Sequence, residues 1–132
     1  MAESKKAFYG HIFRYVAQVL EVIDGDTLRV DLDMGMCIKQ SPKIFRLSGV
    51  NAPESRTSNA AEKKRGLAAK SYLQYLTPVD SWIMIVTDRD VTEKYGRIFG
   101  KAYAEPGAAS INDQMVKAGH SKQWDGQGEK PV

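Results

Sequence analysis

Three short stretches of this sequence carry polar side chains that the folding of a strand or a turn does not require. They read IDGDT at 23–27, FRLSGVNAPE at 45–54 and EKYGR at 93–97. The side chains in question are those of Asp24, Asp26, Arg46, Asn51, Glu54, Tyr95 and Arg97. Carboxylates hold hard cations or accept protons, whereas guanidinium groups stay charged and match paired phosphate oxygens. Metal binding, acid–base chemistry and anion binding are therefore what these residue types allow.

Each stretch also has an interpretation that needs no chemistry. The Asp-Gly pair is a hairpin signal, so IDGDT at 23–27 is by itself more typical of a turn than of a metal site. Arg46, in an apolar strand, fits an edge residue that pairs with a neighbouring acid. Acids favour helix N-termini, so Pro-Glu at 53–54 fits a helix entry, and YGR at 95–97 fits a turn before a strand. Only the three stretches together favour a functional site.

The elements that must position these residues follow from hydrophobic patterning. IFRYVAQVLEVI at 12–23 is rich in β-branched and aromatic residues, which predicts a long strand. DG at 24–25 signals a turn, and TLRVDL at 27–32 alternates as a half-buried strand does. IKQSPKIFRLSGV at 38–50 predicts a third strand, in which Pro42 favours an edge or a bulge.

The second half of the chain adds two helices and two strands. A helix is predicted over 58–76, where small polar residues offer a cap and Thr-Pro ends the pattern. Its apolar face consists of Ala69, Tyr72, Leu73 and Leu76. WIMIVT at 82–87 and RIFGKAYA at 97–104 predict strands. Ser-x-x-Asp opens a short helix at 110–118, which Gly119 ends.

The resulting order is β-β-β-α-β-β-α, and residues 1–132 fit a single domain. This is the order of a five-stranded barrel of the oligonucleotide/oligosaccharide-binding type (OB-fold), with a helix between strands three and four and a short C-terminal helix. The sequence therefore predicts a mainly β fold with helices, in the α+β class. About ten residues at each end are expected to be loosely ordered.

Composition narrows the function only slightly. The hydrophobic fraction of 42%, with 27% charged residues, is ordinary for a soluble protein, and a net charge of +3 with a pI of about 9.0 allows an anionic partner without requiring one. The single cysteine, Cys37, rules out an internal disulfide and is expected to be a small half-buried side chain. No apolar run is long enough to cross a bilayer and no signal peptide is visible. We therefore expect a cytoplasmic protein, or a secreted one if a leader has been removed, with no membrane or obligate protein partner.

In order and spacing, the three stretches resemble the staphylococcal (micrococcal) nuclease family, also called the SNase-like or thermonuclease domain. The likeness runs from IDGDT through FRLSGVNAPE to EKYGRIFGKAY, and SINDQMVKAGHSK is similar to the family's second helix. Each motif is weak by itself, but all three in register are a strong signal over roughly residues 16–122. The resemblance implies a calcium-dependent endonuclease that cleaves phosphodiester bonds in DNA and RNA with little sequence preference.

The resemblance also implies roles for individual residues. Arg46 and Arg97 match the two family arginines, which stabilise the negative charge that gathers on the phosphate oxygens in the transition state. Glu54 matches the glutamate that activates or orients the attacking water, as a base or as a hydrogen-bond acceptor. Tyr95, with Lys94 beside it, matches a phenol that hydrogen-bonds a substrate phosphate.

One calcium ion is the cofactor that the resemblance implies. Asp26 supplies a carboxylate ligand and the backbone carbonyl of Ala52 a further oxygen. Asp24 matches a carboxylate that lies near the metal rather than one that binds it directly. Asn51 stands where the best-known members have a metal-binding aspartate. Asparagine keeps the oxygen but lacks the charge, so we expect an active site with a lower affinity for calcium.

Trp124 and the basic run at 63–65 are two further features that could take part in substrate binding. Trp124 fits either a residue that stacks on a substrate base or one that covers the lower core of the barrel. The basic run at 63–65 is more simply explained as a solvated helix face.

The alternative function is a binding module that has lost the chemistry and holds nucleic acid or a protein, with the Asn51 difference as its only support. A generic barrel for sugars or peptides explains none of the three stretches.

Overall fold

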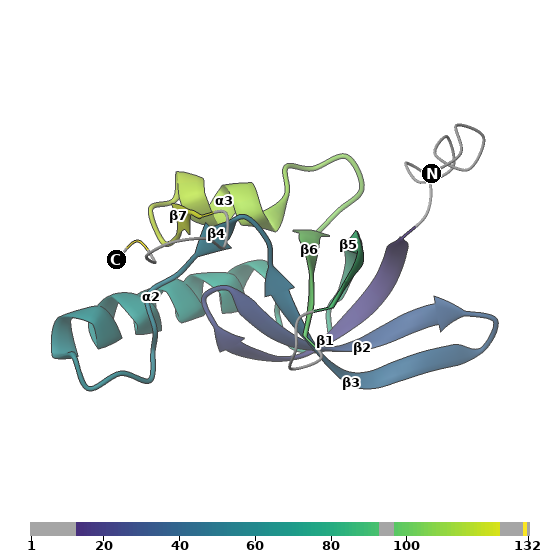
Figure 1. Ribbon diagram of the computed structural model, residues 1–132, viewed down its shortest axis with the longest axis horizontal. Coiled ribbons are helices and arrows are strands. Elements are labelled where there is room, and N and C mark those ends of the chain that lie inside the picture. The colour runs from purple at the N-terminus through teal and green to yellow at the C-terminus, as the bar shows by residue number, and fades with distance from the viewer. Residues whose placement is uncertain (1–12, 93–96, 125–130, 132) are drawn as a thin grey trace.

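Five strands close into a barrel in the computed structural model of this protein, which describes residues 13–92, 97–124 and 131 (Figure 1). Around the barrel the strands follow the order β1-β2-β3-β6-β5, and β5 pairs again with β1. All neighbours are antiparallel except β3 and β6, which are parallel. The barrel strands are β1 (Arg14–Asp24), β2 (Thr27–Gly35), β3 (Ile38–Leu47), β5 (Trp82–Thr92) and β6 (Ile98–Tyr103). The predicted OB-fold is confirmed.

The first hairpin forms because its apolar residues alternate. Leu28, Val30 and Leu32 on β2 are buried, and Ala17 and Val19 on the facing strand β1 are fully buried. Successive side chains of a strand point to opposite faces, so this alternation places one face of each strand in the core. The turn between the two strands falls at the predicted Asp-Gly pair, where Asp24 pairs with Thr27 across the hairpin.

The third predicted strand is shorter than expected and carries the expected bulge. Two residues of β3, including Pro42, lie opposite a single residue of β2. The prediction of one strand through Val50 was wrong, because β3 ends at Leu47 and Gly49 then adopts a left-handed conformation with φ of +74°. The chain resumes as β4 (Val50–Asn51), which pairs with β7 (Lys122–Gln123) in a separate small sheet. Neither short strand was predicted.

The other elements lie close to their predicted bounds. Strand β5 runs further than the predicted 82–87, whereas β6 is slightly shorter than the predicted 97–104. Helix α2 (Ala60–Leu76) begins after Asn59, whose side chain accepts a hydrogen bond from the backbone N–H of Glu62. Helix α3 (Ile111–Lys117) begins after Ser110, which accepts from Asp113 N–H as the Ser-x-x-Asp pattern predicts.

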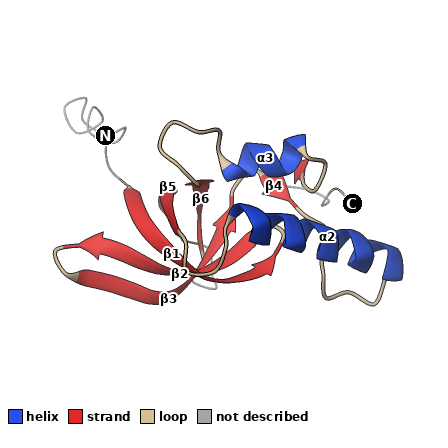
Figure 2. Cartoon of the chain, turned by 180° about the vertical axis from the view of Figure 1, so that it is seen from behind, coloured by secondary structure: helices blue, strands red, loops and turns tan. Residues whose placement is uncertain are grey.

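Both helices lie at one end of the molecule, and the β2–β3 hairpin projects from the other (Figure 2). Helix α2 packs against β1, and α3 packs against β6. The predicted face of α2 is confirmed, because Ala69 and Leu73 are fully buried and Tyr72 and Leu76 pack against the core. Cys37 lies at the tip of the projecting hairpin and is exposed, so the expectation of a half-buried thiol was wrong.

No helix in the described part of the chain is both long enough and apolar enough to span a membrane. The hydrophobic core consists of the barrel interior and the inner faces of the two helices. Its largest fully buried side chains include Phe45, Leu28, Leu47, Leu73, Ile85, Ile111 and Met115.

Gly66 lets the loop after β4 lie directly on helix α2. A Cβ atom at this position would be 2.2 Å from the carbonyl oxygen of Glu54 and 2.6 Å from the backbone nitrogen of Ser55. Both distances are far below van der Waals contact, and the obstructing atoms belong to the backbone rather than to a flexible side chain. The glycine therefore fixes how closely the segment that carries Glu54 approaches the helix.

We expect Gly66→Ala to destabilise the fold even though alanine is the better helix former by about 1 kcal/mol. The loop must move to admit the methyl group, and such overpacking costs about 1–3 kcal/mol. Urea denaturation measures the free energy of unfolding. As a control, Ser71→Ala at an exposed position of the same helix should be neutral or slightly stabilising. A Gly66→Ala protein as stable as the wild type would mean that the loop moves freely.

Candidate active site

Asp26 lies buried at the turn of the first hairpin and holds three parts of the chain together. Its Oδ1 accepts a 2.8 Å hydrogen bond from the Thr27 hydroxyl, and its Oδ2 accepts a 2.9 Å bond from the backbone N–H of Ala52. Its backbone carbonyl accepts from Leu47 N–H at the end of β3. The side chain is only 10% exposed. The turn, strand β3 and the segment after β4 are therefore joined at one residue.

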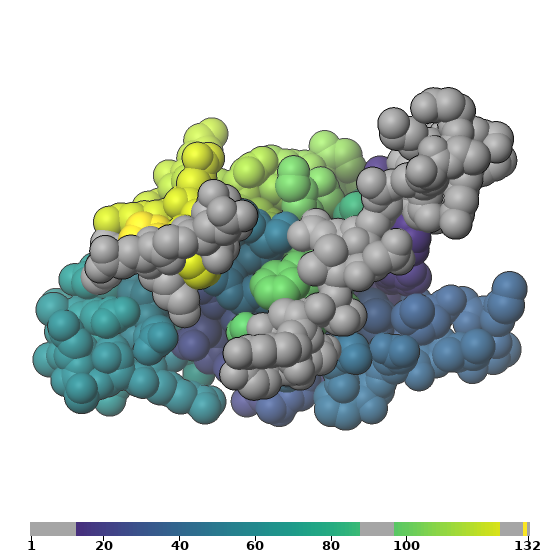
Figure 3. Space-filling model, in the orientation of Figure 1, coloured from purple at the N-terminus to yellow at the C-terminus, as the bar shows by residue number. Residues whose placement is uncertain are grey.

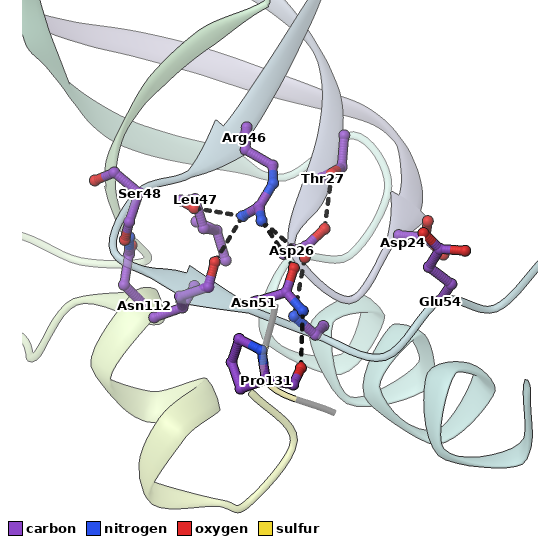
Figure 4. Close-up of polar contacts among 12 residues, drawn as sticks. Asp24, Asp26, Thr27, Arg46, Leu47, Ser48, Asn51, Glu54, Asn112 and Pro131 are labelled. Atoms are coloured by element: carbon purple, nitrogen blue, oxygen red, sulfur yellow. Dashed lines mark hydrogen bonds and ion pairs between the residues drawn. The ribbon is translucent and has the colours of Figure 1, made fainter. Parts of the chain in front are cut away.

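Arg46 reaches the same point from β3 and is also buried. Its Nη2 lies 3.3 Å from Oδ2 of Asp26, which makes a buried ion pair. Its Nη1 donates to the carbonyl oxygens of Leu47 at 2.7 Å and Val50 at 2.9 Å. These bonds bridge the break between β3 and β4 (Figure 4). The sequence also allowed Arg46 to be an edge residue that pairs with a neighbouring acid. The structure contains such an acid, Asp26, but the pair is buried rather than exposed at an edge.

Burial lowers the pKa of Arg46 from its ordinary value, because the charged form loses water. The nearby Asp26 carboxylate opposes this by favouring the charge, and the positive charge of Arg97 adds to the lowering. Guanidinium groups stay charged in proteins, so Arg46 remains a positive group of the site. The site thus holds two positive side chains close enough to act on each other.

Asn51 lies between the arginine and the C-terminal end of the chain. Its Oδ1 accepts a 3.2 Å hydrogen bond from Arg46, and its Nδ2 donates a 3.3 Å bond to the carbonyl oxygen of Pro131. An aspartate could accept the first bond but could not donate the second. The amide therefore suits a position that faces a guanidinium on one side and a backbone carbonyl on the other.

Asp24 and Glu54 form the outer part of the site, apart from the Arg46–Asp26 pair (Figure 4). One oxygen of Asp24 accepts hydrogen bonds from both the backbone N–H and the hydroxyl of Ser55. This ties the hairpin turn to the loop that follows β4. Glu54 precedes Ser55 and is exposed, while its backbone N–H lies 3.5 Å from a carboxylate oxygen of Glu62 on helix α2. Its carboxylate is thus held near the others but open to water.

These residues line one small pocket of about 110 Å³. It is bounded by the first hairpin turn, the end of β3, the segment around β4 and the start of β6. The lining residues are Asp24, Asp26, Thr27, Arg46, Asn51, Ala52, Glu54 and Arg97. All seven residues predicted from the first, second and third stretches to act in catalysis or metal binding therefore meet in one place.

The oxygen atoms around this pocket suit a hard cation as ligands, but few of them carry a negative charge that is free to bind it. Carboxylate and amide oxygens are the ligands that calcium prefers. Asp26 already accepts three hydrogen bonds or ion-pair contacts, out of about four lone-pair positions on a carboxylate. Within the part of the chain that the structure describes, no three residues of the types His, Cys, Asp and Glu come close enough to hold a metal together. A cation here would share Asp26 with Arg46.

The predicted substrate-binding residues are distributed differently. Lys94 and Tyr95 lie outside the described residues. Trp124 is half-buried and donates its backbone N–H to Gly49, and it lines a separate pocket of about 300 Å³ together with Lys101. It does not line the pocket of Arg46 and Asp26. The basic run at 63–65 is exposed on α2, as expected of a solvated face.

Three contributions were not predicted from the sequence. Thr27 belongs to IDGDT and holds the carboxylate of Asp26, but the motif alone does not reveal that bond. Ser55 follows Glu54 directly and fixes Asp24. Gly66 lies on a helix where glycine is disfavoured, and this local cost was the available signal that another segment packs closely there.

Comparison with known proteins identifies the family. The profile of a family described as staphylococcal nuclease homologue matches residues 44–130. A thermonuclease of Staphylococcus intermedius is 33% identical over 102 residues, which cover 76% of this chain and 55% of that protein. A thermonuclease of Staphylococcus hyicus is 29% identical over 103 residues, with 77% and 55% covered. A protein named ParB from Escherichia coli is 26% identical over 109 residues, with 77% and 53% covered.

The chain thus spans about half the length of the curated relatives that it matches. The family match covers most of this chain, including the whole of the second and third stretches. It agrees with the closed five-stranded barrel and with the pocket that joins the three stretches. This chain belongs to the family of staphylococcal nuclease homologues.

Proposed function

We propose that the protein is a metal-dependent nuclease that hydrolyses phosphodiester bonds of DNA and RNA with little sequence preference. The observation that carries the proposal is the meeting of Arg46, Arg97, Glu54 and Asp26 in one polar pocket. The names of the two staphylococcal relatives describe nucleases, which agrees with this chemistry. Groups that bind phosphate recognise no base, so such a pocket favours a substrate of any sequence.

The two arginines are proposed to bind the phosphate that is cleaved. Attack on phosphorus gathers negative charge on the nonbridging oxygens, and fixed positive groups stabilise that charge. Arg46 is anchored by two backbone carbonyls, which holds its guanidinium in place at the pocket wall. Arg97 enters the same pocket from the start of β6. A phosphate between them would meet a positive group on two sides.

Glu54 is proposed to accept a proton or a hydrogen bond from the attacking water. Its side chain is exposed, so water reaches it, and it lines the same pocket as both arginines. The backbone beside it is fixed in two ways, by the close packing on Gly66 and by the bonds from Ser55 to Asp24. A positioned carboxylate of this kind contributes about 10²–10⁴-fold to a rate.

One calcium ion is the proposed cofactor. Asp26 and Asn51, with the backbone carbonyl of Ala52, would hold it, and Asp24 would add a nearby negative charge. When bound, calcium supplies positive charge beside the phosphate that is attacked. The missing charge at Asn51 and the ion pair between Arg46 and Asp26 both favour weak binding.

A binding module without catalysis is the second candidate, and one observation favours it. Arg46 donates to three protein oxygens and pairs with Asp26, so its hydrogen-bonding groups are largely engaged within the protein. A protein that binds nucleic acid but never turns it over would still need the basic residues. Cleavage separates the two candidates, because only the enzyme shortens its ligand.

We expect the wild-type protein to cleave single-stranded DNA and RNA in calcium and to stop when a chelator is added. Glu54→Gln removes the negative charge and the basic oxygen while keeping the shape of the side chain, so kcat should fall about 10²–10⁴-fold. The matched control is Glu105→Gln, an exposed glutamate that does not line the pocket, and it should keep the wild-type kcat. Wild-type protein that cleaves neither substrate at any calcium concentration would refute the enzyme and favour the module.

We expect Asn51→Asp to lower the calcium concentration that gives half-maximal activity. The new charge next to the cation stabilises it by on the order of one to a few kcal/mol, although the variant loses the bond to Pro131. Activity titrated against calcium measures the effect. Asn59→Asp adds the same charge at the N-cap of α2, where aspartate serves as well as asparagine. Equal half-saturation in all three proteins would contradict the proposed role of Asn51.

A further inference from the structure

A second and larger pocket lies beside the candidate active site, between helix α2, strand β4 and the chain around β7. Its volume is about 280 Å³, near the lower end of the range for small-ligand pockets, about 300–1,000 Å³. On this side of the molecule α3, in yellow-green, lies above α2, in teal (Figure 3), and the two helices are in contact. Its walls include Asn51, Pro53, Arg65, Ser121, Lys122 and Pro131.

The two pockets share a wall at Asn51. The amide oxygen of this residue accepts from Arg46 in the candidate active site, and its nitrogen donates to Pro131 of the second pocket. Both pockets are lined by Asn51. The two pockets therefore adjoin one another on either side of the Asn51 side chain.

The lining of the second pocket suits an anion with an attached ring. Arg65 and Lys122 bring positive charge to it, and none of its described lining residues is acidic. Most of the remaining wall is apolar, with Pro53, Ala68 and Pro131 among its residues. The ring of His120 is stacked on Tyr72 at 4.8 Å between centroids, which fixes this part of the wall. A phosphate together with a sugar or base matches both kinds of surface.

From these observations we propose that the second pocket binds the nucleotide unit next to the scissile phosphate. Arg65 and Lys122 hold the phosphate of that unit, and the apolar wall receives its sugar or base. The inference rests on the proposed function, because it places the substrate in the pocket of Arg46. It adds that the enzyme prefers a polynucleotide to a single phosphodiester.

The test compares two substrates in the full-length protein with calcium: a short single-stranded oligothymidylate, and thymidine 5′-(p-nitrophenyl phosphate), which has a single phosphodiester. Arg65→Ala should lower the ratio of kcat/KM for the oligonucleotide to that for the ester about fivefold, as expected for one lost phosphate contact. The slope of log KM against log salt should fall by about 0.7. Lys64→Ala, an exposed lysine that does not line the pocket, should leave the ratio at the wild-type value.

A filling variant provides a second measurement that does not depend on charge. Ala68 is exposed on α2 and lines the second pocket, so Ala68→Phe should lower the same ratio by occupying the space of the nucleotide. Leu67→Phe, an exposed neighbour outside the pocket, is its control. The inference is overturned if the variants and their controls give the same ratio, or if both substrates suffer equally.

Failure of the nuclease proposal can be distinguished from failure of the inference about the second pocket. If the wild-type protein cleaves neither substrate, fluorescence anisotropy of a labelled oligothymidylate decides the question instead. Binding that weakens about fivefold in Arg65→Ala and in Ala68→Phe, but not in Lys64→Ala, supports the second pocket as a nucleotide site without catalysis. Binding that is unchanged in both pocket variants overturns it.

Discussion

The buried pair of Asp26 and Arg46 is the interaction on which the rest of the site depends. Each partner also bonds to the backbone of other segments, so the two charges are well satisfied although both side chains are nearly buried. Removing one partner of a buried pair usually costs about 3–5 kcal/mol, because the other charge stays behind without compensation. The pair thus acts as a structural tie for the first turn, the end of β3 and β4, and it brings the residues with chemistry to one point.

The fold was largely predictable because its main elements have strong local patterns. Alternation along β2 and the helical spacing of the apolar face of α2 each reflect one buried side. The separate strand β4 was missed, because a strand of two residues has no period to detect and its partner β7 lies far along the chain. The end of β3 depends on a left-handed glycine, Gly49, within an otherwise apolar run.

That the candidate residues lie together was predictable, but the bonds between them were not. Motif order placed Arg46, Asn51 and Glu54 near Asp26, and the pocket contains all four. The sequence could not reveal that Arg46 is largely engaged by protein oxygens, because those bonds depend on how the chain bends after β3. The contact between Asn51 and Pro131 joins residues 80 positions apart, which no local pattern encodes.

The single parallel pair of the barrel has a consequence for how the candidate site can come apart. Strand β3 meets β6 only over Phe45–Leu47 and Ile98–Gly100, and this seam completes the ring. Arg46 lies within it and Arg97 immediately precedes it. Because such distant segments join at a high entropic cost, the seam is expected among the later contacts to form. A barrel partly opened by heat or denaturant would therefore separate the two guanidinium groups while its first hairpin is still intact.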